Sequence, residues 1–236
     1  GLASANPATI VGEAGGYSLT LGTAGIYVKQ GAGALSVQPK ILLSGDQLWR
    51  QDGSGVLSVG AVDNGGFTLT VSGSSNTSIA GVLSGSGDLV KTGFSNLTLS
   101  GVNTATGITS INSGSLFAGT GALGYSSAIN VGDGAQLNAV DLNATGSLSI
   151  APASKTFGGK ATITGSDVSV GTVLNESSLT DALAFSATSG TITIGSLLGN
   201  GATRFSSSAK IGGVIVSGTV SVAERLTSNI GGGAVF

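Results

Sequence analysis

Short segments in which apolar and small polar residues alternate recur along the whole chain, and this pattern limits the fold more than any other feature. The apolar positions hold Leu, Ile and Val, and the positions between them hold mostly Ser and Thr. Alternation with a period of two is the pattern of a β-strand with one buried face. Glycine-rich turns separate the segments, so an all-β chain of very short strands is expected. The clearest segments are residues 17–21, 35–37, 56–59, 67–71, 96–99, 108–111, 146–150, 191–194 and 219–222.

The spacing from one strand to the next, about ten residues, is compatible with a β-sandwich, a barrel or a β-solenoid. Aromatic residues make up only 5% of the chain, whereas the two sheets of a sandwich usually need bulky side chains between them. The 42 glycines among 236 residues suit the tight, repeated turns of a solenoid. The pattern therefore predicts a parallel β-solenoid, also called a β-helix, with rungs of roughly twenty to twenty-five residues.

The chain is expected to divide into an N-terminal arm or cap, residues 1–16, and a single β-solenoid, residues 17–236. Within the solenoid, residues 125–236 keep the composition and strand rhythm of residues 17–124. A two-turn helix is an alternative for residues 175–185, where Ser and Asp lie near its start. The alternative architecture is a β-sandwich subunit that is completed by a donated strand, from the arm or from the terminal GGGAVF, between neighbouring copies.

Composition limits the partners of the chain. Charged residues make up 8% and the formal net charge is −2, so nucleic acid is not an expected partner, because its recognition needs a basic surface. No stretch reaches eighteen consecutive apolar residues, the length typical of a membrane-spanning helix, and no membrane span is expected. The hydrophobic share of 40% is too high for a disordered chain. The polar surface must consist mainly of hydroxyl and amide groups.

The chain lacks the residues on which most enzyme chemistry depends. It contains no His and no Cys, and His is the commonest general base and metal ligand. The eleven Asp and Glu residues are scattered, mostly beside Gly, where acidic residues usually form turns. Catalytic, cofactor-binding and metal-binding residues are therefore all predicted to be absent, with one exception to test: stacked rungs could bring Asp46, Asp63 and Asp88 together. A fragment of a calcium-binding repeat, residues 132–137, occurs once, whereas such sites need tandem copies.

A few single residues are candidates for binding or modification. Trp49 is the only Trp and is interpreted as a core or turn aromatic rather than as a glycan contact. The aromatics available to an adhesin are Trp49, Tyr17, Tyr27 and Tyr125, with some Phe. N-glycosylation sequons lie at Asn76, Asn96, Asn143 and Asn175, and several sequons are expected by chance in a chain rich in Ser, Thr and Asn.

The run from Gly85 to Gly119 is the most specific motif. It resembles the autotransporter-associated β-strand repeat found in the passenger regions of bacterial surface proteins, with Ala105 and Phe94 as departures. The resemblance covers about residues 19–124 and implies a right-handed parallel β-solenoid that is secreted or displayed at the bacterial surface. The matching residues are Gly85, Ser86, Gly87, Leu89, Lys91, Gly93, Leu97, Thr98, Leu99, Ser100, Gly101, Asn103, Thr104, Gly107, Thr109, Ile111, Gly114 and Leu116.

The function expected from these observations is that of a non-catalytic structural protein, secreted or at the cell surface. Its partner would be itself, because a solenoid end presents open strand edges and this chain has little charge to repel a second copy. End-to-end association would give extracellular fibres. The alternative is an adhesin or passenger fragment that binds cell-surface or matrix glycans. A polysaccharide-active β-helix enzyme is less favoured, and no cofactor is expected.

Overall fold

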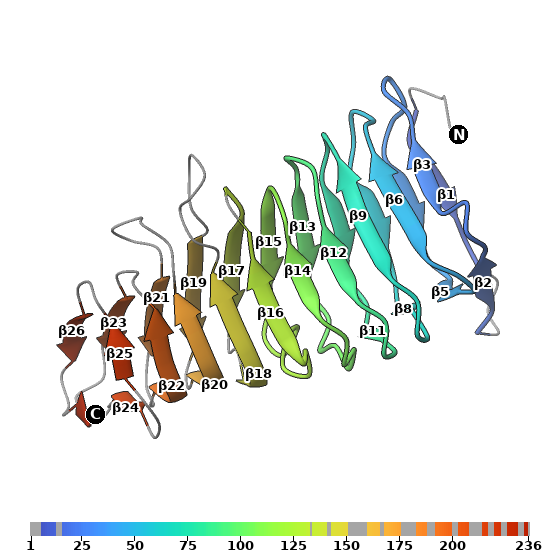
Figure 1. Ribbon diagram of the computed structural model, residues 1–236. Coiled ribbons are helices and arrows are strands. Elements are labelled where there is room, and N and C mark those ends of the chain that lie inside the picture. The colour runs from blue at the N-terminus through green and yellow to red at the C-terminus, as the bar shows by residue number, and fades with distance from the viewer. Residues whose placement is uncertain are drawn as a thin grey trace.

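The computed structural model describes residues 6–12, 16–132 and 134–140, and beyond them the strands between residues 143 and 235. Side chains beyond residue 140 are described only for residues 161–163, residues 183–185 and Thr203. The described elements are all strands, and they stack into a parallel β-solenoid in which β1 to β3 lie at one end and β24 to β27 at the other (Figure 1). The predicted fold class is therefore confirmed.

Among the described residues, sheet A contains twelve strands, and it forms one side of the solenoid. Its strands are β3 (Ile26–Val28), β6 (Gln47–Gln51), β9 (Leu69–Gly73), β12 (Leu89–Lys91), β14 (Thr109–Ile111), β16 (Ala128–Val131), β18 (Asn143–Ile150), β20 (Val168–Asn175), β22 (Ile192–Gly199), β24 (Val214–Val216) and β27 (Ala234–Val235), with β25 (Val220–Val222) also paired to β22.

Sheet B, which forms a second side, contains eleven strands in the part of the chain that is described. Its strands are β1 (Ala8–Ile10), β4 (Leu35–Val37), β7 (Leu57–Val59), β10 (Thr77–Ile79), β13 (Asn96–Leu99), β15 (Ser115–Ala118), β17 (Gln136–Val140), β19 (Lys160–Gly165), β21 (Leu183–Ala187), β23 (Thr203–Ser207) and β26 (Leu226–Ile230). Because β1 falls within the predicted arm, the described part of that arm adds a strand to this sheet, and the boundary at residue 16 stays a prediction.

Sheet C is a third, short side, for which the structure describes four strands, all in the N-terminal half. Its strands are β2 (Ser18–Leu21), β5 (Lys40–Leu43), β8 (Val62–Asp63) and β11 (Leu83–Ser84). Beyond β11 the side chain of Asn103 continues the hydrogen bonding of this side. Its Oδ1 accepts the N–H of Leu83 at 2.8 Å, and its Nδ2 donates to the carbonyl of Ala122 at 2.9 Å.

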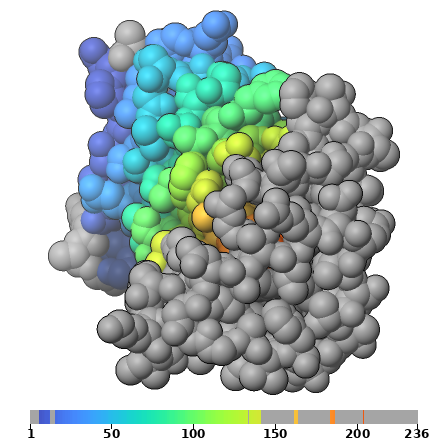
Figure 2. Space-filling model, turned by 90° about the vertical axis from the view of Figure 1, so that its left-hand side faces the viewer, coloured from blue at the N-terminus to red at the C-terminus, as the bar shows by residue number. Residues whose placement is uncertain are grey.

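Successive strands of a sheet are separated by one rung of sequence. Leu35 pairs with Leu57, Leu57 with Thr77, and Thr77 with Leu97, steps of 22, 20 and 20 residues. These steps agree with the predicted rung length. All strand pairs among the described residues are parallel, so the alternative of a β-sandwich, which is built from antiparallel sheets, is wrong. In the space-filling view the described rungs follow one another as bands from blue to yellow (Figure 2).

Where side chains are described, the core is a narrow column of mainly aliphatic residues, in which Trp49 and Phe185 are also buried. Alternate residues of a strand face inward in this described part, as in β13, where Leu97 and Leu99 are buried and Asn96 and Thr98 are not. Each segment predicted as a strand from alternation lies on an observed strand. The helix considered for residues 175–185 falls partly outside the described residues, and residues 183–185 form the start of β21.

Glycine recurs in the turns between sheets A and B because successive rungs approach each other closely there. Gly73, Gly93 and Gly114 occupy these turns with φ of 123°, 72° and 72°, a region that side chains disfavour. A Cβ on Gly93 would lie 2.7 Å from the carbonyl oxygen of Gly73. A Cβ on Gly114 would lie 2.5 Å from that of Gly93. The glycine spacing of the repeat thus follows from the contact between rungs.

Candidate functional site

The carboxylates that stacking was expected to gather serve separate structural roles. Asp46 Oδ1 accepts the N–H of Thr68 at 2.8 Å, and Asp88 Oδ1 accepts the N–H of Ile108 at 2.8 Å. Each Asp precedes a strand of sheet A and bonds to the backbone of the next rung. Thr68 lies in the rung between the two Asp residues, so they are two rungs, or about 10 Å, apart along the axis.

Asp63 lies on sheet C and pairs with a lysine. Lys40 Nζ donates to Asp63 Oδ2 at 3.0 Å, and the N–H of Gly65 donates to Oδ1 at 3.1 Å. The hydrogen bond from Lys40, helped by that from Gly65, lowers the pKa of the Asp63 carboxyl. The described residues contain no group of three His, Cys, Asp or Glu side chains that could hold a metal ion. Asp133 of the calcium-repeat fragment falls outside the described residues.

Trp49 belongs to the core, as predicted. It is fully buried, and its Nε1–H donates to Gln47 Oε1 at 2.8 Å. The amide of Gln47 in turn donates to the carbonyls of Leu21 at 2.6 Å and Gly22 at 2.9 Å. Trp49 is therefore held by a buried amide that links two rungs. It cannot contact a glycan.

Lys91 is a buried cation with no acidic partner among the described residues. Its side chain is completely buried, yet no salt bridge involves it. Instead Nζ donates to three backbone carbonyls, those of Thr92 at 2.6 Å, Gly93 at 3.0 Å and Ser113 at 3.3 Å. Thr92 and Gly93 belong to the turn after β12, and Ser113 belongs to the turn one rung further on. The ammonium group thus joins two successive turns between sheets A and B.

The stability of the fold should depend on the protonation of Lys91. Burial lowers the pKa of Lys91 from 10.5 to about 8. Between these two pH values the unfolded chain binds this proton and the folded chain does not, so stability must rise with pH across the window. We expect the free energy of unfolding to increase there by about 3 kcal/mol from this group. Urea unfolding of the parent protein and of Lys91→Met from pH 7 to pH 11 gives the free energy of unfolding of each as a function of pH. The difference between these two curves measures the contribution of Lys91.

The contributions of the other titrating groups to the pH dependence cancel in this difference, because those groups occur in both proteins. Lys40→Met is the matched control, since it also removes one lysine, but one that is 44% exposed. Parallel curves for the parent and Lys91→Met would contradict the assignment.

The N-terminal end of the solenoid holds an apolar hollow of about 440 Å³. It lies between the end strands β1, β2 and β3 and the neighbouring β4. Among the residues that the structure describes, each of the three end strands has a hydrogen-bonded neighbour on one side only. The hollow therefore combines open strand edges with inward-facing apolar side chains. Its lining residues are Ile10, Leu19, Leu21, Gly25, Ile26, Tyr27, Leu35 and Val37.

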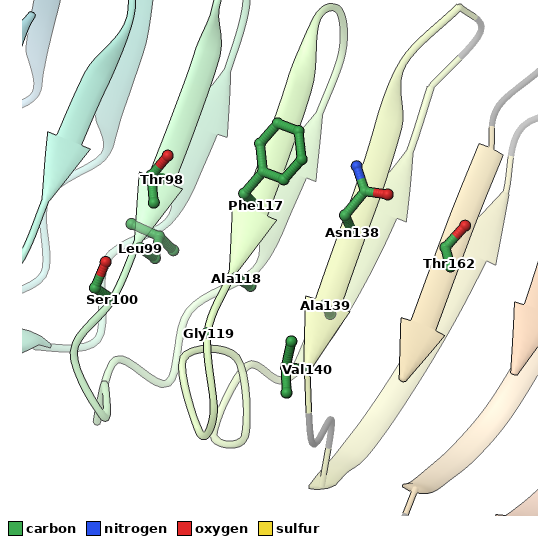
Figure 3. Close-up of a pocket in the computed structure, with 10 residues that line it drawn as sticks. All are labelled: Thr98, Leu99, Ser100, Phe117, Ala118, Gly119, Asn138, Ala139, Val140 and Thr162. Atoms are coloured by element: carbon green, nitrogen blue, oxygen red, sulfur yellow. The ribbon is translucent and has the colours of Figure 1, made fainter. Parts of the chain in front are cut away.

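A second hollow, of about 420 Å³, is a groove on the outer face of sheet B. Figure 3 shows Thr98, Phe117, Asn138 and Thr162 projecting side by side from β13, β15, β17 and β19. Phe117 is 40% exposed. We call this surface the sheet B groove. Its lining residues are Thr98, Leu99, Ser100, Phe117, Ala118, Gly119, Asn138, Ala139, Val140 and Thr162.

Sequence reasoning missed the sheet B groove, although a signal was present. In the segment SLFA the period of two places Leu116 and Ala118 inward and Phe117 outward. Of the aromatics named for an adhesin, Tyr17, Tyr27 and Tyr125 are exposed, and none of them lines this groove. Tyr27 instead lies under the guanidinium of Arg50, at 5.7 Å from the ring centroid.

The sequons differ in what the structure shows of them. The side chain of Asn76 is exposed, and its Oδ1 accepts the N–H of Asn96 at 3.0 Å. Asn143 and Asn175 lie on strands whose side chains are outside the described residues. Over the part of the chain that is described, no helix has the length and hydropathy needed to span a membrane.

Comparison with known proteins gives no relative for this chain. No family model matches it, and neither a curated protein nor a solved structure is significantly similar to it. The fold assignment therefore rests on the strand pairing described above.

Proposed function

We propose that this chain is a non-catalytic structural rod, secreted or displayed at a bacterial surface, whose partner is a second copy of itself. Copies associate end to end into extracellular fibres. Each new copy adds its rungs to those of the copy before.

The observation that carries this proposal is the N-terminal end. Among the described residues, three edge strands, each paired on one side, surround an apolar hollow there. Open edges of this kind template the addition of further strands. Ile10 is 42% exposed and Val11 65% exposed at this end, so docking of another rung would remove apolar surface from water.

The parallel arrangement favours one mode of association. Because all described strand pairs are parallel, an N-terminal end continues the sheets only when it receives the opposite end of a second copy. Such a head-to-tail contact is heterologous, and unless the rotation closes a ring it produces an open filament. The end strands at the opposite end are β26 of sheet B and β27 of sheet A.

Composition and site chemistry support a structural role outside the cell. The chain has no Cys and few charges, and the resemblance of residues 19–124 to an autotransporter-associated repeat favours the bacterial exterior. Asp46, Asp63 and Asp88 each bond to a structural donor. A rod with so few ionisable groups should also keep its form over a wide range of salt and pH.

Sedimentation velocity and electron microscopy of the purified chain test the proposal. We expect assemblies that grow with concentration in the parent protein. Ile10→Lys places a charge in the apolar hollow and should leave mainly single rods. Val102→Lys is the matched control, because Val102 is 61% exposed and lies away from the end strands, and it should assemble like the parent. A parent protein that stays monomeric at every concentration would refute end-to-end association.

A further inference from the structure

We propose that the sheet B groove binds an uncharged, extended glycan that lies along the rod, across β13, β15, β17 and β19. Glycan binding was the alternative function expected from the sequence, and it is assigned here to a specific surface. It goes beyond end-to-end association and does not depend on it, because the groove is on the side of the rod.

The first argument is the chemistry of the lining. The groove presents one aromatic face, from Phe117, between the hydroxyl of Thr98 and the amide of Asn138. Sugars offer matching surfaces, namely an apolar face of C–H groups and hydroxyls around the edge. Aromatic side chains provide a large, rigid apolar contact area for such a face. A binding site of this type needs only a few polar groups to fix the orientation of the ligand.

The second argument is charge. Every residue that lines the groove is uncharged. An ionic ligand, such as an acidic polysaccharide or a phosphate group, would find no opposite charge to replace its hydration. Charge complementarity therefore selects a neutral ligand.

The third argument is the shape of the floor. Gly119 lies beside Phe117 and has no side chain, whereas Ser100 and Val140 stand on either side of it in the neighbouring rungs (Figure 3). The missing side chain leaves a recess between Ser100 and Val140, two residues along the chain from Phe117. Neighbouring rungs are about 4.8 Å apart, close to the spacing of successive rings in an extended β-1,4-linked glycan. Rings of such a chain can therefore follow the rungs along the groove.

The probes are cellohexaose and chitohexaose, two neutral extended β-1,4-linked oligosaccharides, with maltohexaose as a helical, α-linked comparison. Binding is measured by isothermal titration and by saturation transfer from the protein to the sugar protons. We expect both extended probes to bind and maltohexaose to bind more weakly. Phe117→Ala should weaken the binding about tenfold or more, and Asn138→Ala should weaken it by a smaller factor.

Phe94→Ala is the matched control, because Phe94 is 94% exposed on the turn after β12 and does not line the groove. It should bind like the parent. Equal binding by Phe117→Ala and Phe94→Ala would overturn the proposal, and so would the absence of binding by both extended probes. Weaker self-association of Phe117→Ala without glycan binding would also overturn it, in favour of a lateral contact between rods. The titration is repeated with Ile10→Lys, the variant expected not to assemble end to end. Glycan binding by this variant would show that the groove binds independently of assembly.

Discussion

Trp49→Ala should lower the free energy of unfolding by about 3–5 kcal/mol, the range found for buried large aromatics. Trp49 is fully buried in sheet A, between Ile26 of the rung before and Val71 of the rung after. Its removal leaves a cavity that a narrow column of aliphatic side chains cannot close. It also takes away the donor that bonds Gln47 Oε1. Urea unfolding followed by circular dichroism measures the loss, since the variant has no Trp to report by fluorescence.

Two further measurements identify the cause of the loss at Trp49. Phe94→Ala removes an aromatic that is 94% exposed, and it should change stability by no more than about 0.5 kcal/mol. Because each rung contacts only its neighbours, hydrogen exchange in Trp49→Ala should accelerate most from β3 to β9 and less in β16 and β17. A loss below about 1 kcal/mol for Trp49→Ala would show that the packing described here is not what holds these rungs together.

Gly114→Ala should be nearly as damaging, with an expected loss of about 2–5 kcal/mol from backbone strain and overpacking together. A Cβ at this position would lie 2.5 Å from the carbonyl oxygens of Gly93 and Ser95 and 2.9 Å from Lys91 Nζ. The substitution therefore pushes two rungs apart at the point where the ammonium joins them. The thermal midpoint and the urea midpoint should both fall.

Gly31→Ala separates the two contributions at Gly114. Gly31 has a φ of 82°, and a Cβ there would meet nothing within 4 Å. This variant carries the backbone strain alone, so it should cost about 1–2 kcal/mol. If Gly114→Ala were no worse than Gly31→Ala, the close approach of rungs would not explain the glycine spacing.

The alternation in the sequence predicted the fold class and some of the strands of sheets A and B, but not most of them. The segments at residues 35–37 and 96–99 coincide with β4 and β13. One face of each of these strands is buried, and burial of one face makes apolar and polar residues alternate along the strand. Of sheet C, only β2 was predicted, as residues 17–21. Its strands β8 and β11 have two residues each, which is too short for any alternation to be visible.

The buried polar contacts of the interior could not be predicted from the sequence, for a different reason. The period of two places Lys91 at an inward position of β12, between Leu89 and the turn. The acceptors that make this burial tolerable are backbone carbonyls, which every residue has, so no sequence pattern marks them. The separation of Asp46, Asp63 and Asp88 likewise depends on how the rungs align, and alignment is a property of the stacked backbone.

The direction of the hydrogen bonds has a mechanical consequence. In a parallel solenoid the strands run across the rod and their hydrogen bonds run along it, so a force that pulls the two ends apart loads successive rungs in series. The outermost rung then gives way first, and it peels off while those behind it stay closed. Each released rung adds about twenty residues of slack, roughly 65 Å of extended chain. Such a rod would therefore lengthen in steps under tension and rewind when the tension is removed.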